Sequence, residues 1–301
     1  MPLLPRFGTA SRAVYSRAPR RAATAAIIRS RSKTTTTTSH YFQAGSDFEQ
    51  TKAARPEYSP NEPIRYIKSP NVAWKKGDGA SDGGASLSAG HVAIDPYAPG
   101  RPLARNYKLL VSGIAPRPIA FISTRSQDGS SVNLAPFSYF QVINHDPPLF
   151  TVSFVGSMDK AKDTLKNLLE TKECVINIIS EHFMEAANAT AANAPYGVSE
   201  FGLAGLHQAE SSTVAAPRVR ESVFSIEGKL FETKEFESRA KPGKKTSVLA
   251  IIEGTRFWVR EDAINESQDL IDLEVLRPVS RLGGIGYGRT TEVVEIERPA
   301  F

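Results

Sequence analysis

The stretch IAFISTRSQDGSSVNLAPFSYFQV, residues 119–142, decides the fold of this chain. Residues 119–125 combine β-branched, aromatic and hydroxyl side chains, a composition typical of a strand. Asp128-Gly129 is a tight-turn pair, because glycine adopts a positive φ without strain, and it predicts a hairpin whose returning strand spans residues 132–142. Pro136 lies within that returning strand and cannot donate a backbone hydrogen bond. We therefore expect the strand to lie at a sheet edge or to bend there.

Further strands are predicted after this hairpin. The triplet Asp146-Pro147-Pro148 is a strong break, and residues 149–154 follow it as a third strand. These three strands are expected to form a consecutive antiparallel meander. Similar apolar runs predict more strands at residues 174–179, 225–233 and 247–259.

Two segments show helical rather than strand periodicity. A face of leucines predicts a helix over residues 164–172, and Asp163 is placed to cap its first turn. Residues 181–192 are a second helix candidate. Many strands of similar length with few helices favour an antiparallel β-barrel with helical additions over a doubly wound parallel sheet.

The charge of the chain is unevenly distributed. The formal net charge is +5, from 37 basic and 32 acidic residues. Eight basic residues lie within residues 1–46 and the first acid is Asp47, which leaves 29 basic against 32 acidic residues in the remainder. The basicity therefore belongs to the amino-terminal leader, and no nucleic-acid partner is expected.

Residues 1–46 are rich in Arg, Ser, Thr and Ala and contain no acid, which is typical of an organelle transit peptide. This composition predicts a mitochondrial presequence and a mitochondrial matrix location. A disordered basic tail is the alternative interpretation. No apolar run approaches the length that a membrane-spanning helix needs, so no integral membrane segment is expected.

Residues 47–102 are rich in proline and glycine, which favour turns and extended chain. They are predicted to form a linker or a loosely wrapped arm, which Tyr58 and Trp74 are suited to anchor to a surface. The organised domain is expected over residues 103–290, and residues 291–301 are a carboxyl-terminal tail.

Few residues offer metal or nucleophile chemistry. The five histidines never occur in a tight ligand spacing, so no metal site is predicted. Cys174, the single cysteine, lies in an apolar strand and is expected to be a buried, inert thiol. No catalytic side chain is assigned.

A polar loop before the helix at residues 164–172 is a candidate phosphate site. It contains Lys160 and Lys162, and Thr164 opens the helix. Amide, hydroxyl and ammonium groups that converge at a helix amino end bind phosphate. On composition alone, a capped helix with solvated lysines remains the alternative.

A set of short motifs, taken in order, resembles the flavin reductase-like family over residues 103–287. The motifs are Tyr107-Lys108-Leu109-Leu110, Pro116-Arg117-Pro118-Ile119-Ala120, Ser123-Thr124 with Asp128-Gly129, Asn133-Leu134-Ala135-Pro136-Phe137-Ser138, Asp146-Pro147-Pro148, Lys162-Asp163-Thr164-Leu165-Lys166-Asn167 and Arg281-Leu282-Gly283-Gly284. The resemblance implies an FMN-binding split barrel with Greek-key antiparallel topology. It also implies a homodimer with one FMN per subunit at the interface.

The resemblance further implies which residues hold the cofactor. Those expected to face the flavin ring and ribityl chain are Arg117, Ser123, Thr124, Asn133, Ala135, Phe137 and Ser138. Lys160, Lys162 and Thr164 are expected to hold the phosphate, whereas Asn188-Ala189-Thr190 and Arg281-Leu282-Gly283 are expected to close the site. The basic loop at residues 239–245 is not matched to any part of the family pattern, so the resemblance does not indicate how the flavin is reached.

The expected function is that of an FMN-dependent oxidoreductase. NADH or NADPH is expected to stack on the exposed flavin face and to reduce bound FMN or a second, exchangeable flavin. In such enzymes the cofactor performs the hydride chemistry and the protein orients it. An FMN-dependent oxygenase or oxidase of a small organic substrate is one alternative, and a non-catalytic flavin-binding module is another.

Overall fold

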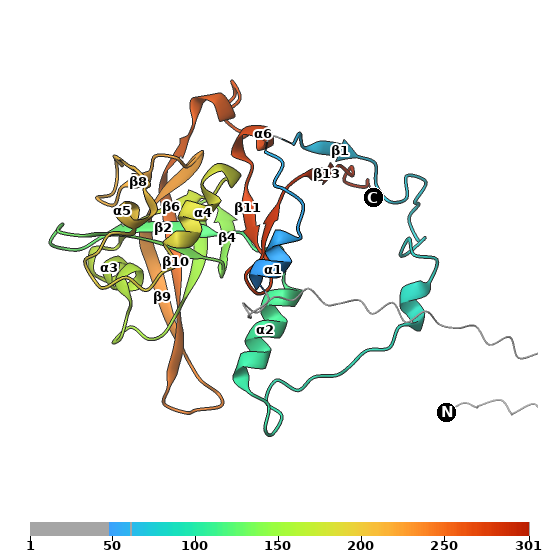
Figure 1. The fold of residues 1–301 in the computed structure, drawn as a ribbon, viewed down its shortest axis with the longest axis horizontal. Helices are drawn as coiled ribbons and strands as arrows, with labels where there is room; N and C mark the ends of the chain where they lie inside the picture. Colours follow the sequence, from blue (N-terminus) through green and yellow to red (C-terminus); the bar gives the residue numbers. More distant parts are fainter. Residues whose placement is uncertain (1–47, 61, 301) are drawn as a thin grey trace, which may run out of the picture. The chain divides into compact units, whose positions relative to one another are not determined.

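The computed structural model describes residues 48–60 and 62–300 of the 301-residue chain. Its main feature is a seven-stranded sheet in the order β3-β2-β6-β9-β10-β5-β4, in which every neighbouring pair is antiparallel (Figure 1). The strands are β2 (Ala120–Arg125), β3 (Val132–Phe137), β4 (Phe140–His145), β5 (Pro148–Val155), β6 (Glu173–Ile178), β9 (Phe224–Glu237) and β10 (Lys245–Val259). The predicted leader, residues 1–46, lies outside the described residues.

The sheet curls into a barrel because its two edge strands are consecutive in the chain. β3 ends at Phe137 and β4 begins at Phe140, although they occupy opposite edges. A flat sheet holds the edges of seven strands about 29 Å apart, whereas three residue steps span at most about 11 Å. The backbone N–H of Ser153 in β5 donates to the carbonyl of Tyr139, 2.9 Å away, so the connection lies against β5. The sheet order contains no β3–β4 ladder, so the barrel is split between these two edge strands. We call the line between β3 and β4 the seam.

The predicted antiparallel barrel with helical additions is confirmed, but the predicted meander is wrong. Residues 132–142 form two strands that belong to separate hairpins, β2–β3 and β4–β5. The chain crosses the seam at Ser138 and Tyr139, where β3 reaches the edge of the sheet. The expected edge position of the strand that contains Pro136 is confirmed, since β3 has a partner on one side only.

The main core fills the barrel and is closed by helix α3 (Asp163–Thr171). Leu165 and Leu168 of α3 are buried against inward-facing residues of β2, β5, β6, β9 and β10. The predicted helix is confirmed, but Asp163 does not cap it, because the helix begins one residue earlier and its N-cap is Lys162. Asp163 instead lies in the first turn, where its charge complements the helix dipole.

A second core covers the outer face of β2 and β3. Phe121 and Leu134 are fully buried there, beneath the 3-10 helix η2 (Glu181–Phe183), α4 (Met184–Ala189) and α5 (Glu200–Ala204). The single helix predicted over residues 181–192 is therefore wrong in extent: a 3-10 turn precedes a six-residue α-helix. The hairpin of β7 (Gln208–Ala209) and β8 (Arg218–Val219) continues this layer through the buried Val219.

The remaining elements precede or follow the barrel strands in the sequence. Before it come α1 (Phe48–Ala53), β1 (Arg65–Ile67), η1 (Ala85–Ser88) and α2 (Leu103–Gly113). After it come η3 (Glu261–Ala263), α6 (Leu273–Leu276), β11 (Val279–Arg281), β12 (Tyr287–Arg289) and β13 (Glu292–Val294). β1 pairs in parallel with β13, so residues more than 220 positions apart lie side by side (Figure 1).

Candidate functional site

The start of helix α3 is joined to edge strand β3 by a buried hydrogen bond. The Asn133 side-chain amide donates to the Thr164 hydroxyl, 2.6 Å away, and both side chains are buried. Asn133 is expected to face the flavin and Thr164 to hold its phosphate. The fold therefore brings these two parts of the predicted site together.

Two lysines lie beside this junction on the exposed loop before α3. The Lys162 ammonium donates to the Asn193 side-chain oxygen, 3.1 Å away, and Lys160 is also exposed. Two ammonium groups, together with the N–H groups of the first helical turn, form a donor set that fits a phosphate. Asn193, which sequence reasoning missed, lies three residues beyond Thr190 of the predicted closing segment.

Ser123 and Thr124 are placed differently from their expected role. The Ser123 hydroxyl donates to the Pro217 carbonyl at 2.5 Å, and the Thr124 hydroxyl accepts from the Asn167 amide at 3.1 Å. Both side chains are fully buried. In this conformation neither side chain has surface available to a ligand, and both hydroxyl groups form hydrogen bonds within the protein.

Arg117 connects helix α2 to the segment that is expected to close the site. Its guanidinium donates to the carbonyls of Val111 and Ile114, each at 2.6 Å, and to that of Leu282 at 3.0 Å. Arg117 and Arg281 also exchange backbone hydrogen bonds. Among the described residues, the buried Arg117 Nε has no hydrogen-bond partner. Arg117 therefore positions the Leu282 turn.

The turn between β11 and β12 packs tightly against α2. A Cβ added to Gly283 would lie 3.1 Å from the Cα of Ser112, which is closer than ordinary van der Waals contact. Glycine at this position therefore lets the two backbones approach. Because Gly283, a predicted closing residue, has no side chain, its backbone can lie directly against α2.

The two predicted closing segments meet through Tyr287, which sequence reasoning also missed. The Tyr287 hydroxyl donates to the Asn188 side-chain oxygen at 2.8 Å, and the Arg281 guanidinium lies 4.6 Å from the centre of the Tyr287 ring. Burial raises the pKa of Tyr287, whereas the charge of Arg281 opposes that change. Thr190 is buried, and its hydroxyl donates to the Ala187 carbonyl, so its side chain stabilises the end of α4.

Three predicted flavin residues lie along the open seam. Ala135, Phe137 and Ser138 are partly buried on or just after edge strand β3. The Phe137 ring packs edge-on against Phe154 of β5, with ring centroids 4.8 Å apart. The seam therefore presents partly exposed apolar and hydroxyl groups that a ligand or a second subunit can contact.

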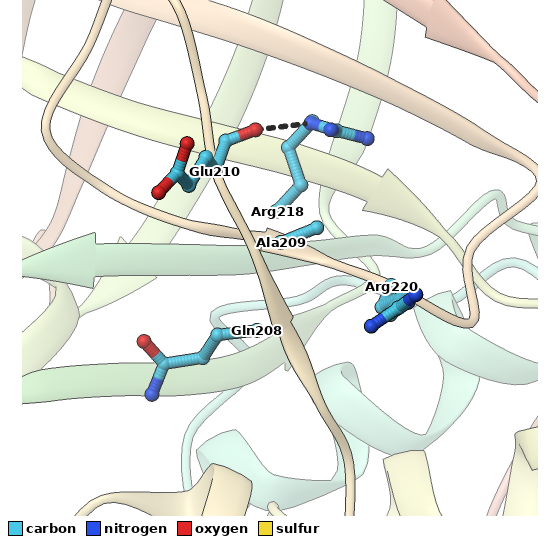
Figure 2. A pocket seen from close by; sticks show the side chains of 5 residues that line it. All are labelled: Gln208, Ala209, Glu210, Arg218 and Arg220. Atoms are coloured by element: carbon cyan, nitrogen blue, oxygen red, sulfur yellow. Dashed lines mark hydrogen bonds between the residues drawn. The ribbon is translucent and has the colours of Figure 1, made fainter.

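A shallow hollow of about 480 Å³ lies elsewhere, at the β7–β8 hairpin (Figure 2). It is lined by Gln208, Ala209, Glu210, Arg218 and Arg220, none of which is a predicted flavin residue. The Arg218 guanidinium is occupied within the protein, because its Nε donates to the Glu210 carbonyl and its central carbon lies 3.8 Å from the centre of the Trp258 ring. Within the described ranges, no group of three or more His, Cys, Asp or Glu side chains is placed to hold a metal ion.

The chain belongs to the flavin reductase-like family. Residues 112–274 match the family model described as "Flavin reductase like domain", which is more than half of the chain. This range contains the barrel, the Asn133–Thr164 junction and the two lysines before α3. The resemblance in the ordered motifs is thereby confirmed.

Curated relatives are similar over about two thirds of the chain. An uncharacterized protein of Aquifex aeolicus is 38% identical over 183 residues, which are 60% of this chain and 88% of that protein. Protein YwrF of Bacillus subtilis, also uncharacterized, is 35% identical over 194 residues, 64% of this chain and 93% of that protein. These relatives are bacterial and have no organelles, so the prediction of a mitochondrial matrix location is wrong. Basic, acid-free composition alone was too weak a signal for a compartment.

Solved structures show the same fold. Nitrilotriacetate monooxygenase component B of Bacillus cereus is 34% identical, covers 69% of this chain and all of that one, and has a TM-score of 0.64. The 2-nitrobenzoate 2-nitroreductase of Pseudomonas fluorescens is 28% identical, covers 70% and 98% of the two chains, and has a TM-score of 0.61. A split-barrel protein of Shewanella frigidimarina, at 22% identity and a TM-score of 0.55 over 67% and 94%, shows the fold alone.

Among the described residues, no helix has both the length and the apolarity needed to cross a membrane.

Proposed function

We propose that this chain is an FMN-dependent oxidoreductase that uses NADH or NADPH to reduce flavin. The observation that carries the proposal is the junction of β3 and α3, where Asn133 and Thr164 meet beside Lys162 within the family domain. The bound flavin supplies the hydride chemistry, and the side chains bind and orient it.

The phosphate of FMN is assigned to the amino end of α3. Lys160 and Lys162 supply positive charge there, and the first-turn N–H groups supply hydrogen-bond donors. Thr164 is already bonded to Asn133, so its main contribution is to fix β3 against the helix start. The flavin ring is assigned to the seam beside Ala135 and Phe137.

A homodimer completes the proposed site. Both seam strands are sheet edges, and in β4 Val142 is 55% and Ile143 50% exposed. Unpaired apolar edges are the part of a sheet that gains most from a partner. A second copy is therefore assigned to the seam, where it covers the flavin.

The test is anaerobic mixing of the purified, FMN-loaded chain with NADH and, separately, with NADPH. The visible absorbance of the flavin is expected to bleach with at least one donor, because hydride transfer reduces the ring. A chain that binds FMN but is reduced by neither donor would support a non-catalytic flavin-binding module and overturn the proposal.

One comparison favours a reaction in which the chain reduces an exchangeable flavin and then releases it. A relative of 34% identity is named component B of a monooxygenase. Turnover with excess free FMN is expected to produce more reduced flavin than there are protein sites. Bleaching that stops at one flavin per subunit would instead indicate a tightly held group. An oxygenated flavin intermediate after air is admitted would favour the oxygenase alternative.

A further inference from the structure

The amino-terminal arm contains a segment that is bonded to the carboxyl-terminal part of the domain. We call residues 58–60 and 62–67 the strap. The Arg277 guanidinium donates to the Glu62 carbonyl at 2.5 Å, and the Ile64 N–H donates to the Glu274 carboxylate at 2.6 Å. β1 then pairs with β13, and Arg65 forms an ion pair with Glu292. These contacts hold the strap in one register.

The first residues of the strap reach a buried carboxylate. The Tyr58 hydroxyl donates to Glu181 Oε2 at 2.5 Å, and Arg289 forms an ion pair with the same oxygen at 3.0 Å. The Arg289 guanidinium also donates to the Ser59 carbonyl at 3.1 Å and lies 4.5 Å from the centre of the Tyr58 ring. Tyr58 and Ser59 therefore contact Arg289 from two directions.

Glu181 depends on these partners because its side chain is only 4% exposed. Burying a carboxylate is costly unless partners compensate the charge. Tyr58, Arg289 and Arg277 all contact Oε2, with Arg277 Nε at 3.7 Å, whereas Oε1 has no hydrogen-bond partner among the described residues. Losing Tyr58 therefore removes a hydrogen bond to this carboxylate and leaves its ion pairs with Arg289 and Arg277.

Arg289 connects the strap to the hairpin that carries the predicted flavin-closing turn. It lies on β12, directly opposite Val279 of β11, and the hairpin contains only three residue pairs. The other end of the same hairpin carries Arg281 and Gly283, which contact Tyr287 and Ser112. In so short a hairpin, fixing one end restricts the orientation of the other.

We propose that Tyr58 and Ser59 are positioning residues: they fix Arg289 and, through hairpin β11–β12, hold Arg281 and Gly283 in place to close over the flavin. This inference rests on the proposed function. The strap lies outside residues 112–274, which match the family model, and the curated relatives above match at most 64% of this chain. The strap is therefore not part of the segment that defines the family match.

The experiment compares Tyr58→Ala with Tyr66→Ala in the full chain. Tyr66 lies in the same strap and is similarly exposed, 64% against 50% for Tyr58, but among the described residues it does not contact Glu181 or Arg289, so its removal controls for the chemical change. Hydrogen exchange is measured without flavin at residues 279–289, and the FMN dissociation rate is measured separately. Tyr58→Phe keeps the ring near Arg289 and separates the ring contact from the hydroxyl bond.

Tyr58→Ala is expected to speed exchange at residues 279–289, to leave β2 and β6 unchanged, and to raise the FMN dissociation rate about fivefold. Tyr66→Ala is expected to change neither, and Tyr58→Phe to fall between. Unchanged hairpin exchange, or faster exchange with unchanged FMN dissociation, overturns the inference. Exchange that rises equally in every strand also overturns it, because it shows only lower overall stability. A wild-type chain that binds no FMN instead overturns the proposed function, and hairpin exchange still reports whether the strap acts on the hairpin.

Discussion

Thr164 shows how a single buried hydroxyl can join two elements of the proposed site. Its hydroxyl is buried and accepts from Asn133, so it joins α3 to the edge strand β3. Lys162 is exposed, and its ammonium donates to the Asn193 side-chain oxygen. The two residues therefore call for different experiments, because replacing Thr164 disturbs the fold whereas replacing a lysine removes charge.

The phosphate assignment predicts a difference between FMN and riboflavin. Replacing Lys160 and Lys162 together by Ala is expected to weaken FMN binding by about tenfold for each lysine that contacts the phosphate, since a charge-assisted hydrogen bond contributes roughly 1.5 kcal/mol or more. Riboflavin binding is expected to stay unchanged. Titration of both flavins followed by fluorescence checks this. The paired replacement of Lys172 and Lys229 is the control, and equal losses for the two flavins would refute the assignment.

Glu181 predicts a pH-dependent contribution to stability. Burial raises the pKa of this carboxyl, but hydrogen bonds from Arg289 and Tyr58 outweigh burial, so its pKa is lowered from 4.5. Its stabilising contribution is therefore present above about pH 4.5 and is lost as the pH falls through the folded-state value. Glu181→Gln is expected to lower the free energy of unfolding by about 2 kcal/mol at pH 7.

Urea unfolding at pH 7 and at lower pH checks this prediction. The difference between wild type and Glu181→Gln is expected to shrink below about pH 4.5, because the wild-type carboxyl then also becomes neutral. Glu185→Gln, at an exposed position on α4, is the control and is expected to cause little change at either pH. A difference that stays constant with pH would show that the charge of Glu181 is not responsible.

At the scale of the elements, strand β9 packs closely against its neighbours at Gly228, a residue without a side chain. Gly228 pairs with Cys174 of β6 on one side and with Gly254 of β10 on the other. A Cβ at this position would lie 2.5 Å from Cγ2 of the fully buried Ile252. Ile252 belongs to the barrel core and has little room to shift. The central strands can therefore approach only because residue 228 is glycine.

Gly228→Ala is expected to destabilise the chain by about 1 to 3 kcal/mol through overpacking. Gly202→Ala is the matched control, since Gly202 lies in helix α5 and a Cβ there meets nothing within 4 Å. That control is expected to be neutral or stabilising by up to about 1 kcal/mol. Denaturant midpoints of the two variants decide the matter, and a Gly228→Ala chain as stable as wild type would contradict the close approach.

For the whole molecule, the split seam leads to a prediction about assembly. Light scattering is expected to give about twice the 32.8 kDa mass of the chain. Ile143→Lys places a charge on the exposed face of edge strand β4 and is expected to shift the mass toward one subunit. Ser130→Lys, at the exposed β2–β3 turn, is expected to leave the mass unchanged. A wild-type monomer that binds FMN tightly would remove the interface from the proposed site.

The local sequence pattern was sufficient to predict the elements whose conformation depends mainly on residues close in the sequence. The strand at residues 119–125, the Asp128-Gly129 turn with Gly129 at φ 73°, and the helix before residue 172 all followed from side-chain type and spacing. Cys174 is buried as expected, and burial raises the pKa of its thiol to about 12.

Only the tertiary structure decided which strand pairs with which and which side chains remain accessible. The predicted meander failed because β3 and β4 occupy opposite edges of the sheet and pair with different strands, β2 and β5. Ser123 is covered by the Pro217 carbonyl, 94 residues away, and the strap pairs with β13 across more than 220 residues. Such contacts depend on how distant segments pack around one core, which no local sequence pattern encodes.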